Sequence, residues 1–214
     1  MRFGGIAIVL ILTQFVAGSV WAGAEEDYQA GLKSHRDGDV VGAMTPLRAA
    51  AMENHPKAQA LLAEILDRTD FDEDALALYR KSAEQGDPDG MFGLGAMLVS
   101  GEGGSKDEPA GRAWILKAAE AGQALAINVV AQAYLKGELG YSEAERATPE
   151  ALAWIRRAAA NAYLPAIDAL AAAYASGTGL AVAVDPGLAE EYRAQANKIR
   201  KLEPTQGKKK QRRL

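Results

Sequence analysis

The sequence predicts an all-α protein, specifically an α-solenoid of stacked antiparallel helix pairs. The stretch "AWILKAAEAG", Ala113 to Gly122, returns further along the chain as "AWIRRAAANA", Ala153 to Ala162. Both copies are rich in alanine, the residue with the highest helix propensity. A repeat of this length is typical of helix pairs that cannot bury their apolar faces alone and do so by stacking.

The first predicted element is a secretory signal peptide over residues 1–22. A basic start precedes an apolar run from Phe3 to Leu12, and the small residues Ala22 and Ala24 offer cleavage sites. An uncleaved membrane anchor is the alternative, because Phe3 to Ala22 is long enough to span a bilayer. We expect a periplasmic or secreted protein.

Residues 23–55 are expected to form an N-terminal helix pair, and residues 56–203 about four further pairs. The second helices share a large or apolar residue that small residues follow one turn later. These positions recur every 32 to 40 residues, at Pro46, Leu78, Trp114, Trp154 and Tyr192. In the best copy, Thr148 is a typical N-cap residue and Pro149 a typical first helical residue.

The first helices have an apolar pattern of their own. In "AINVVAQAYLKG", Ala126 to Gly137, four apolar residues follow the i, i+3, i+4, i+7 spacing of one helical stripe. They are Ile127, Val130, Ala131 and Tyr134. The stretches Gly90 to Gly101 and Ala166 to Gly177 share this pattern, and Ala58 to Thr69 follows it more loosely. The closing glycines suit helix C-termini.

These residues resemble the Sel-1-like repeat, a relative of the tetratricopeptide repeat. The resemblance lies in the pair Leu94-Gly95, in the glycine that closes the first helix, and in the Ala-Trp-x-x-x-Ala-Ala-x-x-Gly second helix. It covers about Pro56 to Ala196, whereas "RDGDVVGAM", Arg36 to Met44, is more similar to a tetratricopeptide turn. The resemblance implies a non-catalytic scaffold or regulator of the bacterial cell envelope that binds a protein or peptide partner.

Composition and charge exclude several classes of protein. The chain has no cysteine, which excludes disulfides and Cys-zinc sites. The formal net charge is −4, and because the tail "KKKQRR" is basic, the rest of the chain is more acidic than this value. An acidic body argues against nucleic acid as a partner. Residues 204–214 are predicted to be a disordered basic tail that contacts either an anionic membrane weakly or the acidic body.

No pattern points to catalysis, a cofactor or a metal. His35 and His55 have no ligand partner at helical spacing and are expected on the surface. Asp70, Asp72 and Asp74 have the spacing of a calcium loop but lack its glycine and its closing glutamate. The glycine-rich stretch "GEGGSKDEPAG" lacks the Gly-Lys-Ser/Thr of a phosphate loop. We therefore do not expect an enzyme.

The partner site is predicted from the helix register. In tetratricopeptide-like solenoids, the face of the first helix that lies away from the core stripe lines a concave groove, and the resemblance implies the same arrangement here. Counted at 100° per residue from Ile127, this face identifies the predicted contact residues Asn128, Gln132, Lys136, Asp168, Phe92 and Glu64. Phe92 is the expected anchor. An ordinary solvated face is the alternative.

A second class of function is binding of peptidoglycan or exopolysaccharide. It would need exposed aromatic rings, for which Phe92, Tyr141 and Tyr163 are the candidates. Trp114 and Trp154 are expected in the core instead, because they recur in an apolar context. We expect a monomer.

Overall fold

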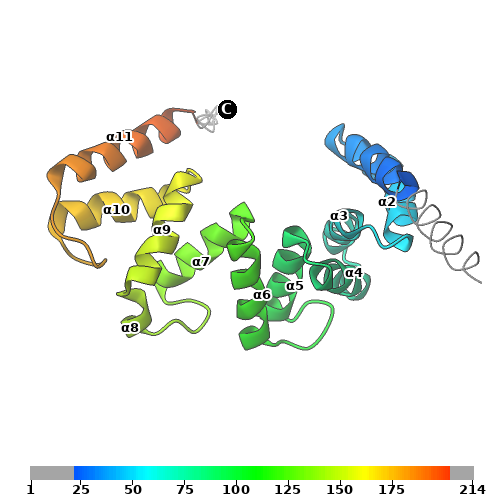
Figure 1. Ribbon diagram of the computed structural model, residues 1–214, viewed down its shortest axis with the longest axis horizontal. Coiled ribbons are helices and arrows are strands. Elements are labelled where there is room, and N and C mark those ends of the chain that lie inside the picture. Colours follow the sequence, from blue (N-terminus) through cyan, green and yellow to red (C-terminus); the bar gives the residue numbers. More distant parts are fainter. Residues whose placement is uncertain (1–21, 203–214) are drawn as a thin grey trace, which may run out of the picture. The chain divides into compact units, whose positions relative to one another are not determined.

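The computed structural model describes residues 22–202, and this range is helical and free of strands. A helical segment spans residues 22–36. It is followed by α2 (Val40–Met52), α3 (Pro56–Asp67), α4 (Asp72–Glu84), α5 (Pro88–Ser100), α6 (Glu108–Glu120), α7 (Ala124–Lys136), α8 (Glu143–Arg146), α9 (Pro149–Ala160), α10 (Leu164–Ser176) and α11 (Pro186–Leu202) (Figure 1). The predicted all-α solenoid of helix pairs is confirmed.

Two predicted segments fall at the ends of the chain. The signal peptide, residues 1–22, lies outside the described residues except for Ala22, and so does the tail, residues 204–214. Between them, the helices of the described range include none that is both long enough and apolar enough to cross a membrane.

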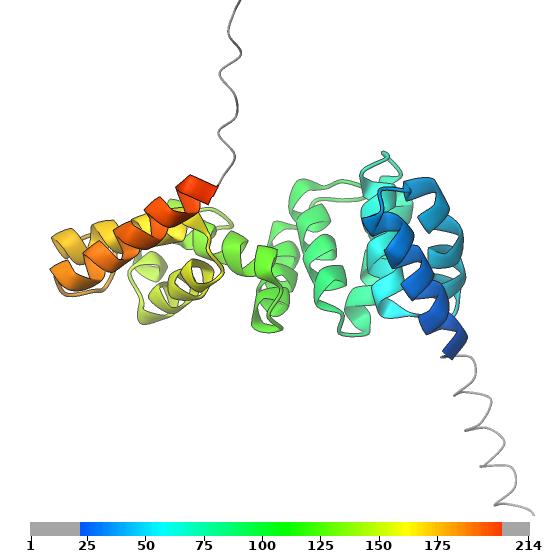
Figure 2. The ribbon, with the colours of Figure 1, turned by 90° about the horizontal axis from the view of Figure 1, so that it is seen from above.

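The chain divides into two compact units, with the boundary between Ala126 and Ile127 inside α7. Their described parts are residues 22–126, called unit 1, and residues 127–202, called unit 2. In unit 1 each helix from α2 to α5 packs against the next one in sequence (Figures 1 and 2). Helix α3 also packs against α5. This contact between first helices of successive pairs is the stacking that the repeat pattern predicts.

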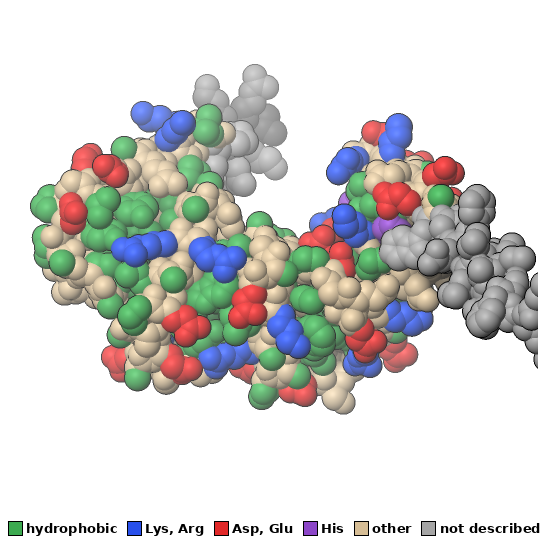
Figure 3. Space-filling model, in the orientation of Figure 1, with side chains coloured by type: hydrophobic (Ala, Val, Ile, Leu, Met, Phe, Trp, Pro, Cys, Tyr) green, Lys and Arg blue, Asp and Glu red, His purple; other side chains and the backbone are tan. Residues whose placement is uncertain are grey.

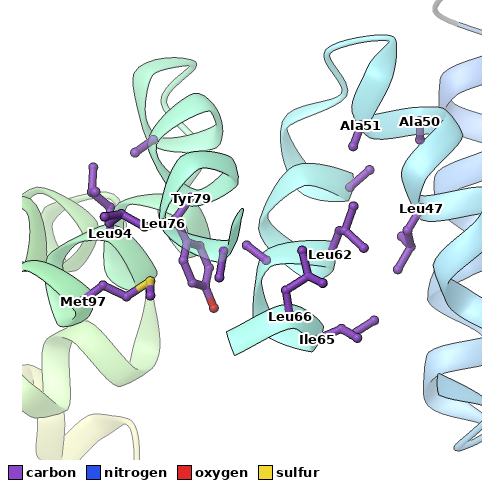
Figure 4. Close-up of a cluster of buried hydrophobic side chains, with 14 of the residues drawn as sticks. Leu47, Ala50, Ala51, Leu62, Ile65, Leu66, Leu76, Tyr79, Leu94 and Met97 are labelled. Atoms are coloured by element: carbon purple, nitrogen blue, oxygen red, sulfur yellow. The ribbon is translucent and has the colours of Figure 1, made fainter. Parts of the chain in front are cut away.

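The core of unit 1 consists mainly of leucine and alanine from successive helices (Figure 4). Leu47 of α2 is fully buried, and Leu94 of α5 is 2% exposed. The helices begin at well-formed caps: the Asp87 side chain accepts from the Gly90 backbone N–H, and Asp107 does the same for α6. Proline in the first turn of α3, α5 and α6 supports these starts.

Helices α5 and α6 approach each other closely at two glycines. A Cβ atom on Gly95 would lie 2.9 Å from the Gly111 carbonyl oxygen, and a Cβ atom on Gly111 would lie 2.7 Å from the Gly95 carbonyl oxygen. The obstacle is backbone in both directions, so neither position accepts a side chain without moving a helix. The predicted helix-closing glycines are confirmed as well, because Gly101 and Gly177 adopt left-handed C-caps at φ 89° and 70°.

Unit 2 has the same plan with a longer loop between α7 and α9. Thr148 caps α9 by accepting from the Ala151 backbone N–H, with Pro149 in the first turn, as predicted. The short helix α8 within the loop ends at Arg146, whose guanidinium donates to the carbonyl oxygens of Tyr134 and Leu135 at 2.8 and 2.7 Å. This arginine satisfies carbonyls that the end of α7 leaves free.

Trp154 on α9 lies in the core of unit 2, as the repeat predicts, and is 7% exposed. We expect Trp154→Ala to lower the free energy of unfolding by about 3–5 kcal/mol, because it removes a buried ring that neighbouring helices cannot replace. Thermal melting followed by circular dichroism measures the effect. A melting temperature equal to that of the wild type would show that the proposed repeat register is wrong.

Candidate functional site

Unit 1 contains a cavity of about 520 Å³ on the face formed by its first helices. We call this cavity the unit 1 groove. Its lining comes mostly from the segment 22–36, from α3 and from α5, with Tyr79 as the contribution of α4. The residues that line it are Tyr28, Leu32, Arg36, Lys57, Ala60, Leu61, Glu64, Asp67, Arg68, Tyr79, Asp89, Phe92, Gly93, Ala96, Gln123 and Leu125.

The groove brings together two of the predicted contact residues, Glu64 of α3 and Phe92 of α5. Each occupies the face of its helix that the register calculation selected. The small residues Ala60, Gly93 and Ala96 lie beside them and leave the hollow open. Phe92 is half-buried, so part of its side chain remains accessible.

The groove carries three acidic and three basic side chains. Glu64 and Arg68 form an ion pair at 3.5 Å, and the Asp89 carboxylate accepts from the Gln123 amide at 3.2 Å. Figure 3 shows acidic and basic side chains next to one another over α3. The remaining groups, Arg36, Lys57 and Asp67, form no hydrogen bond or ion pair through their side chains with any described residue.

The wall beside Tyr28 is built around a buried histidine, which corrects the expectation that His55 lies on the surface. His55 is 3% exposed because it caps α3: its Nδ1 accepts from the Ala58 backbone N–H. Its Nε2 lies 2.9 Å from a Glu25 carboxylate oxygen, and its ring stacks on Tyr28 with centroids 4.7 Å apart. The His-Pro pair at the start of α3 was the signal for this role, since a cap residue often precedes a helical proline.

Hydrogen bonds stabilise the Glu25 carboxylate at this wall. Those from Gln29 and then from His55 lower the pKa of Glu25 below its usual value. The contact links the segment 22–36 to the start of α3 and so holds Tyr28 at the edge of the unit 1 groove.

Four predicted contact residues lie in unit 2, where most of their polar groups are already engaged. Gln132 accepts from the Tyr163 hydroxyl and donates to Glu138 at 3.1 Å. Lys136 lies 3.8 Å from the same glutamate. Asp168 accepts two hydrogen bonds from Arg200 at 2.8 and 2.6 Å. The fourth residue, Asn128, is half-buried, and its side-chain oxygen has no hydrogen-bond partner in the described part of the chain.

The candidate aromatic residues for glycan binding have different environments. The expectation for Tyr141 was wrong, because this residue is 5% exposed and its ring packs 4.0 Å from that of Tyr134. Tyr163 is half-buried and bonded to Gln132, and Phe92 lies in the unit 1 groove. Tyr141 therefore cannot contribute to an exposed aromatic surface of the kind that stacks on a sugar ring.

The lining of the unit 1 groove contains no serine, cysteine or histidine. Over residues 22–202, no three His, Cys, Asp or Glu side chains are grouped so that they could hold a metal ion. The arrangement of apolar, aromatic and charged groups suits binding of an extended or helical segment.

Comparison with known proteins agrees with the repeat pattern. The chain matches the Sel1 repeat family over residues 56–87, 88–123, 124–163 and 165–196, which confirms the resemblance. No curated protein matches it.

Three solved structures share the fold. A protective antigen present in uropathogenic Escherichia coli strains, displaying an SLR fold, is 25% identical with a TM-score of 0.69, covering 82% of this chain and 38% of that one. A Sel1 repeat protein from Oxalobacter formigenes is 25% identical with a TM-score of 0.67, covering 82% and 73%. A protein from Klebsiella pneumoniae subsp. pneumoniae described as a sel1 repeat protein is 20% identical with a TM-score of 0.56, covering 84% and 88%. This chain thus spans less than half the length of the E. coli antigen.

The Tyr79 hydroxyl forms no hydrogen bond with the described residues although the side chain is 6% exposed. We expect Tyr79→Phe to leave the free energy of unfolding within about 0.5 kcal/mol of the wild type or to raise it, because no bond is lost. The matched control is Tyr163→Phe, which loses the bond to Gln132 and should cost about 1 kcal/mol. Urea unfolding measures both, and a larger loss for Tyr79→Phe than for Tyr163→Phe would contradict this account.

Proposed function

Because this chain belongs to the Sel1 repeat family, whose members generally act as protein-interaction scaffolds, we propose that it binds a protein or peptide partner in the unit 1 groove. The observation that carries the proposal is the groove itself. First helices of successive pairs bring an accessible aromatic ring, apolar residues and charged groups without partners to one hollow. These are the features by which grooves of this kind hold a peptide side chain and its backbone.

We propose that the protein is a non-catalytic scaffold or regulator. Sel1 repeat proteins are generally non-catalytic scaffolds.

We further propose that the protein works in the bacterial cell envelope, periplasmic or secreted, as a monomer. The support for this location is the predicted signal peptide over residues 1–22. The basic tail would add a weak contact with an anionic membrane surface. Binding of peptidoglycan or exopolysaccharide is the less supported alternative, because one of its three candidate rings, Tyr141, is buried.

Substitution of Phe92 tests the groove. Phe92→Ala should weaken capture of the partner from envelope extracts by about 30-fold, because truncation of a central aromatic anchor typically costs about 2 kcal/mol or more. The matched control is Phe71→Ala, since Phe71 is 58% exposed and does not line the groove. Quantitative mass spectrometry of the captured proteins measures the loss. Equal capture by both variants would exclude the unit 1 groove as the binding site.

The N-terminus of the native protein tests the proposed location. We expect mass spectrometry to find a chain that begins at Gly23 or Glu25, after cleavage at Ala22 or Ala24. Either product keeps the contact between Glu25 and His55. A native chain that still carries Phe3 to Leu12 would instead indicate a membrane-tethered form.

A further inference from the structure

Tyr79 differs from its counterparts in the repeat. The equivalent position is Ile115 in α6 and Ile155 in α9, which are 2% and 0% exposed. In those helices an apolar side chain fills this position in the core. Tyr79 adds a hydroxyl at this core position, and that hydroxyl has no hydrogen-bond partner within residues 22–202. The hydroxyl is not sealed in the core: it opens to the unit 1 groove, where water or a ligand can pair with it.

The Tyr79 side chain extends from α4 between α3 and α5 to the unit 1 groove. Figure 4 shows the ring between Leu66 and Met97, with the hydroxyl oxygen at its free end. The ring passes so close to Gly93 that a Cβ atom there would lie 2.2 Å from the Tyr79 Cε1 atom. The corresponding residues of the next first helices are Val129 and Ala169, so glycine at this position makes the room that the tyrosine needs.

Asp67 lines the same groove, at the last position of α3. It is half-buried, and its carboxylate forms no hydrogen bond or ion pair with a described residue. Burial raises the pKa of the Asp67 carboxyl, and the nearby carboxylates of Glu102, Asp72 and Glu64 raise it further. Arg68, the cation that opposes this rise in the pKa of Asp67, already pairs with Glu64 at 3.5 Å. The charge next to Asp67 is therefore negative, although the groove lining as a whole holds three acidic and three basic side chains.

The same carboxylates act on Tyr79. Burial raises the pKa of the Tyr79 hydroxyl well above its usual value, and Asp67 and Glu64 raise it further. The hydroxyl consequently stays neutral and keeps two lone pairs that can accept hydrogen bonds. The Asp67 carboxylate and the Tyr79 hydroxyl oxygen are acceptors to which no described residue donates, and Phe92 offers an aromatic ring in the same groove. An ammonium or guanidinium group fits all three.

We propose that the unit 1 groove binds a peptide segment by inserting one of its lysine or arginine side chains between Asp67, Tyr79 and Phe92. This inference deepens the proposed function and rests on it. Arg36 and Lys57 line the groove as well, so a segment with a single basic anchor fits better than a polybasic one, which these two charges would repel.

This proposal can be tested with a random peptide library displayed on phage. The library is selected for binding to the protein in the form that is isolated from cells. The peptides to analyse are those that no longer bind when Phe92 is changed to alanine, since these occupy the groove. We expect them to share a lysine or arginine at one position. A synthetic peptide of this set should bind at least about tenfold more weakly when norleucine replaces its lysine, as measured by fluorescence anisotropy.

Two protein variants assign the anchor to its partners. Asp67→Asn should weaken binding of the lysine peptide by about tenfold. In this variant, replacing the lysine of the peptide by norleucine should weaken binding little further, because the two changes remove the same interaction. The control, Asp70→Asn, makes the same charge change three residues away and outside the groove. Its backbone lies at φ 62°, a conformation that asparagine adopts readily. Tyr79→Phe provides the second variant and should weaken the lysine peptide more than the norleucine peptide.

The outcomes separate the two proposals. Phe92-dependent peptides without a shared basic residue would overturn the cation anchor and leave the groove as the binding site. Equal binding of the lysine peptide to Asp67→Asn and Asp70→Asn would do the same. If no selected peptide depends on Phe92, both the anchor and the proposed function of the groove fail. A melting curve for each variant tests whether it is folded. If Asp67→Asn is unfolded, the comparison of the two peptides on Tyr79→Phe decides whether the cation anchor is correct.

Discussion

The structure depends on the stacking of one helix pair on the next, because a single pair has no other way to bury its apolar stripe. The contact between α3 and α5 brings the first helices together, and the mutual close approach of Gly95 and Gly111 sets how near α5 can lie to α6. Alanine and glycine at these contacts keep the helices close. The unit 1 groove is a consequence of this packing, since it forms where small residues of neighbouring first helices face outward.

Much of the fold follows from the sequence because packing imposes a period. The repeated alanines, the closing glycines and the caps at Thr148 and Asp87 are local signals, and each appears where the helix that needs it begins or ends. The register also placed Glu64 and Phe92 on the face that lines the groove. The repeat period does not predict which polar groups on a helix face pair with other side chains of the chain. Nothing in the spacing of Gln132 or Asp168 shows that Tyr163 and Arg200 bind them within the chain.

Two errors of sequence reasoning have a common cause. His55 was expected on the surface because it has no ligand partner at helical spacing, and Tyr141 because it lies outside the helical stripes, but both are buried at or beside the ends of helices. At a helix end, free backbone groups and a change of chain direction create burial that no helical period reports. His55 is used there as a cap, and Tyr141 covers Tyr134 of the preceding helix. The position of Tyr79 in the groove was missed for a different reason: the repeat pattern predicts a core residue at this position and does not show that its hydroxyl reaches the groove.

The repeats share one frame but differ in what occupies the face of their first helices. In unit 2, side chains of the chain itself satisfy most of this face, as the paired oxygens of Asp168 on Arg200 illustrate, and the Asn128 side-chain oxygen is the exception among the four predicted contact residues. In unit 1, the equivalent face keeps Asp67, Lys57 and Arg36 without partners among the described residues and adds the Tyr79 hydroxyl at a position where an isoleucine would pack. Lys57 and Arg36 are exposed to water, whereas Asp67 is half-buried and the Tyr79 hydroxyl opens to the groove, so a ligand in the groove can pair with both. The contrast between the units therefore favours unit 1 as the part of the chain that meets a partner.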